Sequence, residues 1–114
     1  MDTPTAMPPD PSPWTPETDP VRLKVLGKLI EEFSEGGSAA ARCIIQGVNE
    51  AEPVTGKINR VWLEDELADA LANIRRTIES LGLDHERINL RAERKYAYIT
   101  RWLEGLNRPA EKAV

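Results

Sequence analysis

The sequence lacks several features that would assign a function class at once: it has a single cysteine, no long hydrophobic run and no excess of positive charge. One cysteine excludes a disulfide within the chain, and Cys43 stands among isoleucines and alanines, where a buried, inert thiol is expected. The net charge of −4 gives no basic footprint for nucleic acid and is compatible with a site that collects cations. Neither a signal-like start nor an apolar stretch of about 18 residues is present. We therefore expect a cytoplasmic protein that neither binds nucleic acid nor enters a membrane.

Proline is scarce beyond the N-terminus, because seven of the nine prolines lie within the first twenty residues. Such a stretch disfavours helix and central strand. We predict a disordered arm over residues 1–20, in which Trp14 is either a stray aromatic or a docking residue. A helical domain is expected over 21–107, followed by a flexible tail over 108–114. About 90 residues support only a modest core, which favours assembly into a homodimer or homotetramer.

Apolar residues recur at steps of three and four along three segments, which is the period of an α-helix. The segments cover 21–48, 60–81 and 85–106, separated by a loop over 49–59 and by a cap at Gly82 and Asp84. The stripes expected to form the core are Leu26, Ile30, Phe33, Gly37, Ala41, Ile44 and Val48, then Leu63, Leu67, Leu71, Ile74, Ile78 and Leu81, then Ile88, Ala92, Ile99, Trp102 or Leu103, and Leu106. The sequence therefore predicts an all-α fold, an antiparallel helical bundle of about three main helices that is completed by oligomerisation.

A second, more polar stripe borders the apolar one on each of the first two helices. The two stripes are Lys28, Glu32, Glu35 and Ala39, and Trp62, Glu66, Asp69 and Asn73. If the helices pack side by side, four carboxylates converge and repel one another unless a cation lies among them. Oxygen ligands without histidine or cysteine suit Mg²⁺ or Mn²⁺ and not zinc. The alternative is a solvated helix face, on which acidic pairs are common.

Two further features are open to two interpretations each. Lys95 occupies the apolar stripe of the third helix, with Arg91 and Arg94 nearby, and either extends its amine to the surface or contacts a phosphate. Gly36 and Gly37 each cost about 1 kcal/mol against alanine inside a helix. They either allow close approach of a backbone or a flat ligand, or serve only tight helix packing, or mark a kink.

The acidic residues fall in two short motifs. "EEFSE" at 31–35 is an EExxE motif and "ELAD" at 66–69 is an ExxD motif. In this order, on consecutive helices and followed by a basic third helix, they resemble the MazG-like, all-α nucleotide pyrophosphohydrolase superfamily. That superfamily includes dimeric dUTPases, dCTP pyrophosphatases and phosphoribosyl-ATP pyrophosphohydrolases. The resemblance covers residues 23–105. Gly-Gly after the first motif, and the lack of an asparagine beside Lys95-Tyr96, depart from the family pattern.

The resemblance implies an enzyme that uses Mg²⁺, or Mn²⁺, to cleave nucleoside triphosphates to monophosphate and pyrophosphate in nucleotide-pool house-cleaning. The implied metal ligands are Glu32, Glu35, Glu66 and Asp69, and the implied catalytic residues are Glu31, Glu35 and Lys95. The expected substrate contacts are Lys28, Trp62 stacked on the base, Asn73 hydrogen-bonded to it, and Arg91, Arg94 and Lys95 on phosphate. Two alternatives remain open, a phosphoribosyl-ATP pyrophosphohydrolase and a non-catalytic helical oligomer that binds a nucleotide or a protein.

Overall fold

The computed structural model describes residues 14–107 and contains three helices. They are α1 (Pro20–Gln46), α2 (Asn59–Leu81) and α3 (His85–Leu106). Within the described residues the extended pairing is limited to one isolated bridge between Ala51 and Ile58. The prediction of an all-α fold is thus confirmed. The predicted tail and residues 1–13 of the predicted arm lie outside the described residues.

Local signals explain where the helices begin and end. The side chain of Asp19 accepts a hydrogen bond from the Arg22 amide and caps α1. The helix begins at Pro20, inside the segment predicted to be an arm, because proline is well suited to the first helical position. Asp84 caps α3 in the same way, and Gly82 ends α2 with a φ of 65°, as predicted. The caps therefore fix the boundaries of the helices to within two residues of the predicted ones.

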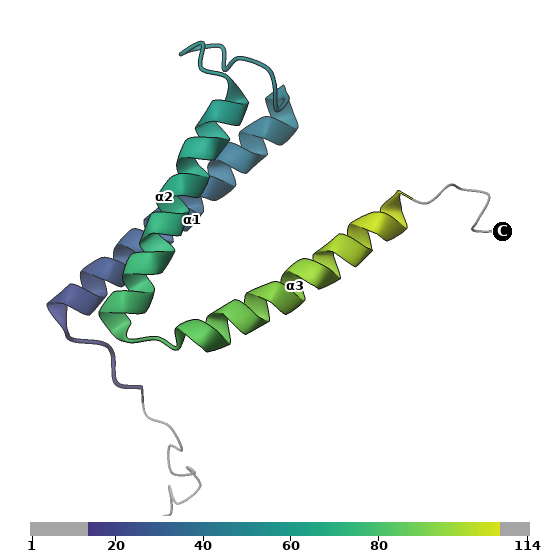
Figure 1. The fold of residues 1–114 in the computed structure, drawn as a ribbon. Helices are drawn as coiled ribbons and strands as arrows, with labels where there is room; N and C mark the ends of the chain where they lie inside the picture. The colour runs from purple at the N-terminus through teal and green to yellow at the C-terminus, as the bar shows by residue number, and fades with distance from the viewer. Residues whose placement is uncertain (1–13, 108–114) are drawn as a thin grey trace, which may run out of the picture.

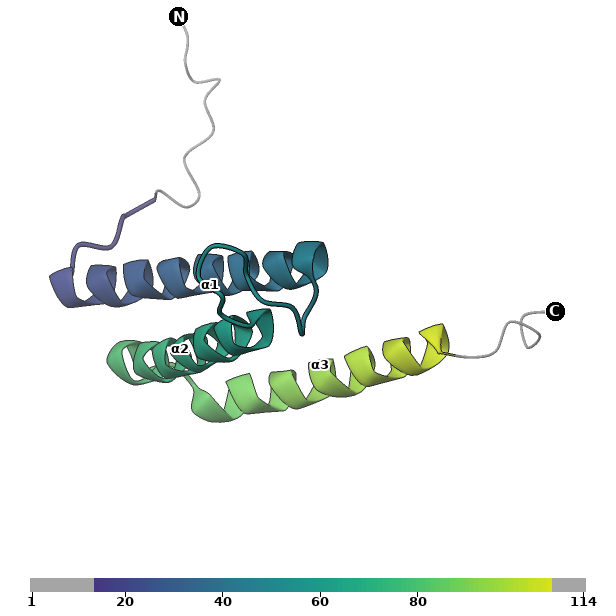
Figure 2. The ribbon, with the colours of Figure 1, turned by 90° about the horizontal axis from the view of Figure 1, so that it is seen from above.

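The two longer helices form an antiparallel hairpin, from which α3 departs after a short turn (Figures 1 and 2). Three residues of α1 are buried, Glu32, Ala39 and Cys43, and two of α2, Asn59 and Thr77. We call this line of contact the seam. It is narrow and largely polar, and the Cys43 Sγ approaches the Asn59 carbonyl oxygen at 3.8 Å across it.

The prediction that the apolar stripes of α1 and α2 form the core is wrong for the single chain. Ile30, Phe33 and Ile44 are 67%, 54% and 86% exposed, and Leu67 and Leu71 of α2 are also exposed. Two helices cover only one side of each other, and here the small residues Ala39 and Cys43 occupy that side. The helices therefore meet along a line that includes Glu32, and the apolar residues named above lie on the outer surface. The remaining members of the α2 stripe are half-buried, namely Leu63, Ile74, Ile78 and Leu81.

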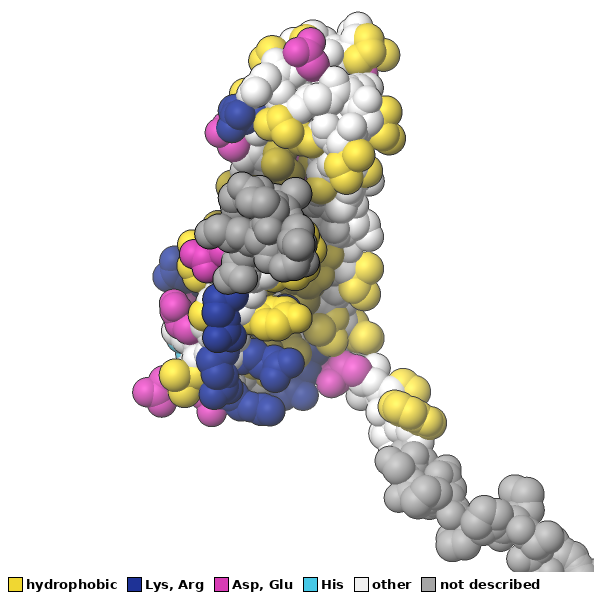
Figure 3. All heavy atoms as spheres, turned by 90° about the vertical axis from the view of Figure 1, so that its right-hand side faces the viewer, with side chains coloured by type: hydrophobic (Ala, Val, Ile, Leu, Met, Phe, Trp, Pro, Cys, Tyr) yellow, Lys and Arg dark blue, Asp and Glu magenta, His cyan; other side chains and the backbone are white. Residues whose placement is uncertain are grey.

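The third helix packs little against the hairpin. Of its residues only Ile88 is even half-buried, and Tyr96, Trp102 and Leu106 are more than half exposed. Figure 3 shows Lys and Arg side chains gathered on the lower part of one face of the molecule, with hydrophobic side chains above them. None of the described helices is both long and apolar enough to cross a membrane.

The glycine pair neither kinks nor breaks α1, which runs unbroken across Gly36 and Gly37. A Cβ atom added at either position would meet nothing within 4 Å in the described chain. The packing of α1 on α2 therefore does not require these glycines. The space beside both positions is open within the described chain.

The buried amide of Asn59 should hold the loop end of the hairpin together. It is fully buried, and its Nδ2 donates to the Gln46 Oε1 at 3.2 Å and to the Gly47 carbonyl at 3.0 Å. We expect Asn59→Ala to lower the free energy of unfolding by about 1 to 3 kcal/mol, because buried acceptors lose their donor. Urea unfolding at fixed protein concentration measures this, with the exposed Asn89→Ala as control. Equal stability of the two variants would contradict the assignment.

Candidate functional site: an acidic cluster in the seam

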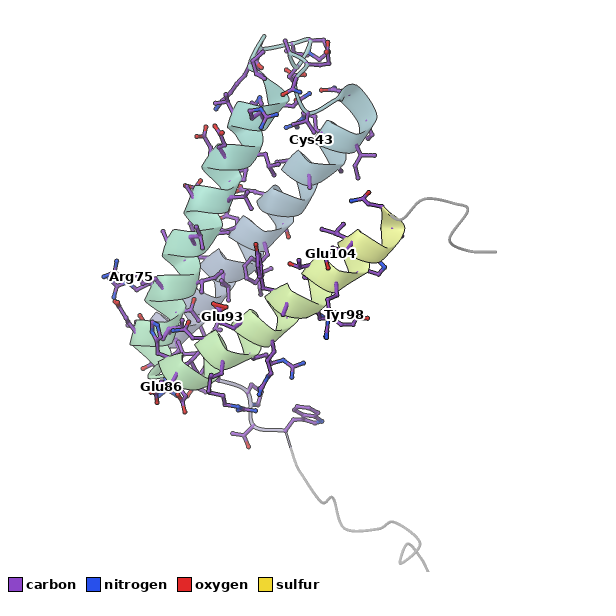
Figure 4. The ribbon with its side chains drawn as sticks, turned by 45° about the vertical axis from the view of Figure 1, so that its right-hand side comes forward. Cys43, Arg75, Glu86, Glu93, Tyr98 and Glu104 are labelled. Atoms are coloured by element: carbon purple, nitrogen blue, oxygen red, sulfur yellow. The ribbon has the colours of Figure 1, made fainter. Side chains whose placement is uncertain are left out.

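Two of the predicted metal ligands lie inside the seam between α1 and α2. Glu32 is only 5% exposed and Glu66 is half-buried. Cys43 opposite Asn59 sets the antiparallel register, and counting back along α1 and forward along α2 brings Glu35 to within one residue of the level of Glu66, with Glu32 about one turn away. Figure 4 shows Cys43 on α1 towards the loop end of the hairpin, so the acidic cluster lies nearer the middle.

Three carboxylates converge at this level. One oxygen each of Glu32, Glu35 and Glu66 lies within 4.8 Å of the other two. The Oε2 of Glu32 and the Oε1 of Glu66 are buried, and neither has a hydrogen-bond partner among the described residues. A buried charged oxygen without a partner is costly. The cluster is therefore incomplete without a positive or donating group.

The third carboxylate, that of Glu35, stands at the exposed edge of the cluster. Partial desolvation, and then the negative charges of Glu32, Glu66 and Glu31, raise its pKa above the ordinary value of 4.5. Every charge that shifts this pKa is negative. The electrostatic potential at the cluster therefore favours a cation or a proton.

Among residues 14–107, Lys28 is the cation that pairs with these residues of α1. Its Nζ lies 2.8 Å from the Glu31 Oε1 and 3.4 Å from the Glu32 Oε1. Hydrogen bonds to Glu31 and then to Glu32 raise the pKa of Lys28. Lys28 thus neutralises one side of Glu32, while Oε2 on the other side stays without a partner. The predicted substrate contact of Lys28 and the predicted catalytic role of Glu31 stay predictions.

The donor set and its size fit a hard divalent cation. Ligand oxygens on opposite sides of Mg²⁺ are about 4.2 Å apart, twice the metal–oxygen distance. The three oxygens lie within 4.8 Å of one another, which is close to that separation. All three ligands are oxygens, which suits Mg²⁺ or Mn²⁺. The two unpartnered buried oxygens are the atoms that such an ion would satisfy.

The fourth predicted ligand, Asp69, is not part of the converging group. It is exposed on α2, one turn from Glu66, and its backbone carbonyl accepts a hydrogen bond at 2.8 Å from the Asn73 Nδ2. The Asn73 amide, predicted to contact a base, is therefore used within its own helix. Coordination by Asp69 and base binding by Asn73 stay predictions.

Trp62 has two neighbours that the sequence analysis did not identify. The Arg42 guanidinium carbon lies 5.2 Å, and the Lys57 Nζ 4.5 Å, from the centroid of the Trp62 ring. Arg42 continues the polar stripe of α1 at the step of three after Ala39, so the spacing was a usable signal. Lys57 lies in the loop, where no periodicity applies. Two cationic side chains thus lie over the ring that was predicted to stack on a base.

The basic residues of α3 lie away from the acidic cluster. Arg91, Arg94, Lys95 and Tyr98 line an open surface hollow of about 390 Å³, and the Lys95 Nζ lies 5.6 Å from the centroid of the Tyr98 ring. Because α3 leaves the hairpin, Tyr98 lies on the outer part of the molecule (Figure 4). Within one described chain these residues and the carboxylates do not form one site. The phosphate contacts of Arg91, Arg94 and Lys95 stay predictions.

Removing one charge from the cluster should stabilise the metal-free protein. In EDTA near pH 7, Glu35→Gln should raise the urea midpoint, because it relieves repulsion with Glu32 and Glu66. A raised folded-state pKa gives stability that is present at low pH and lost as pH rises through that pKa. The advantage of the variant should therefore shrink towards about pH 4. Glu93→Gln, on α3, is the control, and an unchanged or lower midpoint for Glu35→Gln would refute the repulsion.

Comparison with known proteins adds no further constraint. No protein-family model, curated protein or solved structure matches the chain. The candidate site therefore rests on the geometry of Glu32, Glu35 and Glu66, and on the two buried oxygens that lack partners.

Proposed function

We propose that the protein is a Mg²⁺-dependent nucleoside triphosphate pyrophosphohydrolase that releases a monophosphate and pyrophosphate. The observation that carries the proposal is the convergence of three carboxylates with two unpartnered buried oxygens. The EExxE and ExxD motifs, which contain the same three residues, support this reaction class. Removal of surplus or non-canonical nucleotides is the role that we propose for it.

The reaction places a limited set of demands on the side chains. Water adds to one phosphorus, the bridging oxygen leaves with the other phosphate, and the proton of the water passes to a base. Glu32, Glu35 and Glu66 would hold the ion, which supplies neutralisation of phosphate charge and a lower pKa of bound water. Glu31, held by Lys28 at 2.8 Å, is exposed beside the cluster and is our candidate for orienting the water.

We also propose that the apolar stripes are covered by a second copy of the chain. The outer surface of α1 presents Ile30, Phe33 and Ile44, and that of α2 presents Leu67 and Leu71. A contiguous exposed apolar surface of this kind marks an interaction site. A homodimer or homotetramer buries equivalent stripes against each other and would complete a helical bundle.

A substrate panel tests the proposed reaction. Incubation of the protein with NTPs, dNTPs and phosphoribosyl-ATP plus Mg²⁺ should yield monophosphate and pyrophosphate from at least one of them. Glu35→Gln and Glu66→Gln should lower the rate about 100-fold or more, as expected for loss of a preorganised electrostatic contact. Glu93→Gln should retain the rate. Tight nucleotide binding with no turnover would reject the enzyme in favour of a binding oligomer.

The assembly is tested by size-exclusion chromatography with light scattering. We expect a mass that is two or four times the 12.8 kDa of one chain. Phe33→Glu and Ile44→Glu should shift it towards the monomer, because a charge is costly inside an apolar contact. Val54→Glu, in the loop and 89% exposed, is the matched control. A wild-type protein that elutes at the mass of one chain would rule out the assembly.

A further inference from the structure

The cations at Trp62 form a second cluster in the seam, next to the acidic one. It draws on three segments, since Arg42 lies on α1, Lys57 on the loop and Trp62 on α2. Lys57 is paired with Asp65, whose Oδ2 lies 2.7 Å from its Nζ. Arg42 makes no ion pair within residues 14–107, although hydrogen bonds from Thr55 to the Glu52 Oε1, and also the charge of Arg42, lower the pKa of the Glu52 carboxyl. The Arg42 guanidinium therefore remains available for a further anion.

Helix geometry places these cations close to the carboxylates. Trp62 precedes Glu66 by four residues, about one turn or 6 Å along α2. Side chains on a helix lean towards its N-terminus, and this lean takes the Arg42 side chain from the level of Asn59 back over the Trp62 ring. The positive cluster thus lies about one turn from the acidic cluster, along the same seam.

We propose that Arg42 and Lys57 bind the terminal phosphates of the substrate and retain pyrophosphate after cleavage. The identity of the substrate in this inference rests on the proposed function. Two linked phosphates can extend across one helical turn, so one end can lie at the carboxylates while the other reaches the cations. A guanidinium stacked on an aromatic face keeps its N–H edge free for a bidentate contact with phosphate. Trp62 is then a positioning residue that holds the cations, in place of the predicted base platform.

The same geometry gives the substrate a direction. At the other end of the cluster, Lys28 is already engaged by Glu31 and Glu32. The open positive charge lies on the side of the loop 47–58. The pyrophosphate end therefore points to that loop, and the nucleoside end points along the seam towards the start of α1. The basic residues of α3 are not needed for this step.

Calorimetric titration with inorganic pyrophosphate tests the site directly. In Mg²⁺ the wild type should bind, and Arg42→Ala should bind about tenfold or more weakly because charge-assisted hydrogen bonds are lost. Lys57→Ala should have a smaller effect because Asp65 already shares its charge. The affinity of Arg42→Lys should fall between those of the wild type and Arg42→Ala, because lysine keeps the charge but cannot donate the paired hydrogen bonds of a guanidinium. Arg76→Ala, exposed on α2, is the control. Thermal melts of every variant verify folding.

The outcomes separate this site from the proposed reaction. Wild-type affinity in both Arg42→Ala and Lys57→Ala, or no pyrophosphate binding by the wild type, overturns the site. If a dNTP is hydrolysed while KM and pyrophosphate inhibition stay unchanged in these variants, the reaction stands and the site fails. If no nucleotide is hydrolysed but pyrophosphate binding depends on Arg42, the anion site stands and the reaction fails. If Arg42→Ala does not fold, the affinities of Lys57→Ala and Arg42→Lys for pyrophosphate still test the site.

Discussion

The close contact of α1 with α2 along a polar seam is the constraint on which the rest of the structure depends. At the loop end, the buried amide of Asn59 joins the start of α2 to the end of α1, and Cys43 approaches the Asn59 carbonyl. These contacts set the register of the two helices. The register in turn decides that Glu66 faces Glu32 and Glu35 and that Arg42 reaches Trp62. A shift of one helix by one turn would separate Glu66 from the two glutamates of α1, and would also separate Arg42 from Trp62.

The seam accepts groups that folding alone would exclude. Glu32 is buried with one oxygen unsatisfied, and Glu66 contributes a second such oxygen from the facing helix. Unsatisfied buried charge lowers stability, and the large apolar side chains nearest to it on the seam, Leu29 and Leu63, are only half-buried. Such local conflict is typical of functional sites, where the rest of the fold holds groups in arrangements that they would not adopt alone.

The sequence was sufficient for the features that depend on near neighbours in the chain. Asp84 and Gly82 act through groups within a few residues, so the caps could be predicted. The spacing of Glu32 and Glu35 fixes their shared side of α1 wherever that helix packs. The buried side of each helix could not be predicted in this way, because amphipathicity identifies the apolar side and not the element that covers it. Lys57 was missed for a related reason, since the loop alone brings it to Trp62.

The angle around each helix between its exposed apolar residues and its exposed carboxylate has a consequence for assembly. At about 100° per residue, Ile30, Phe33 and Ile44 lie about 140° to 180° around α1 from Glu35. On α2, Leu67 and Leu71 lie at a similar angle around the helix from Asp69. When two antiparallel helices have the same angle between their apolar and acidic residues, the apolar residues of both helices lie on the same face of the pair. The hairpin therefore has one apolar face and, opposite it, an edge that exposes Glu35 and Asp69. A second copy docked on the apolar face leaves that edge open, so assembly and access to the carboxylates are compatible.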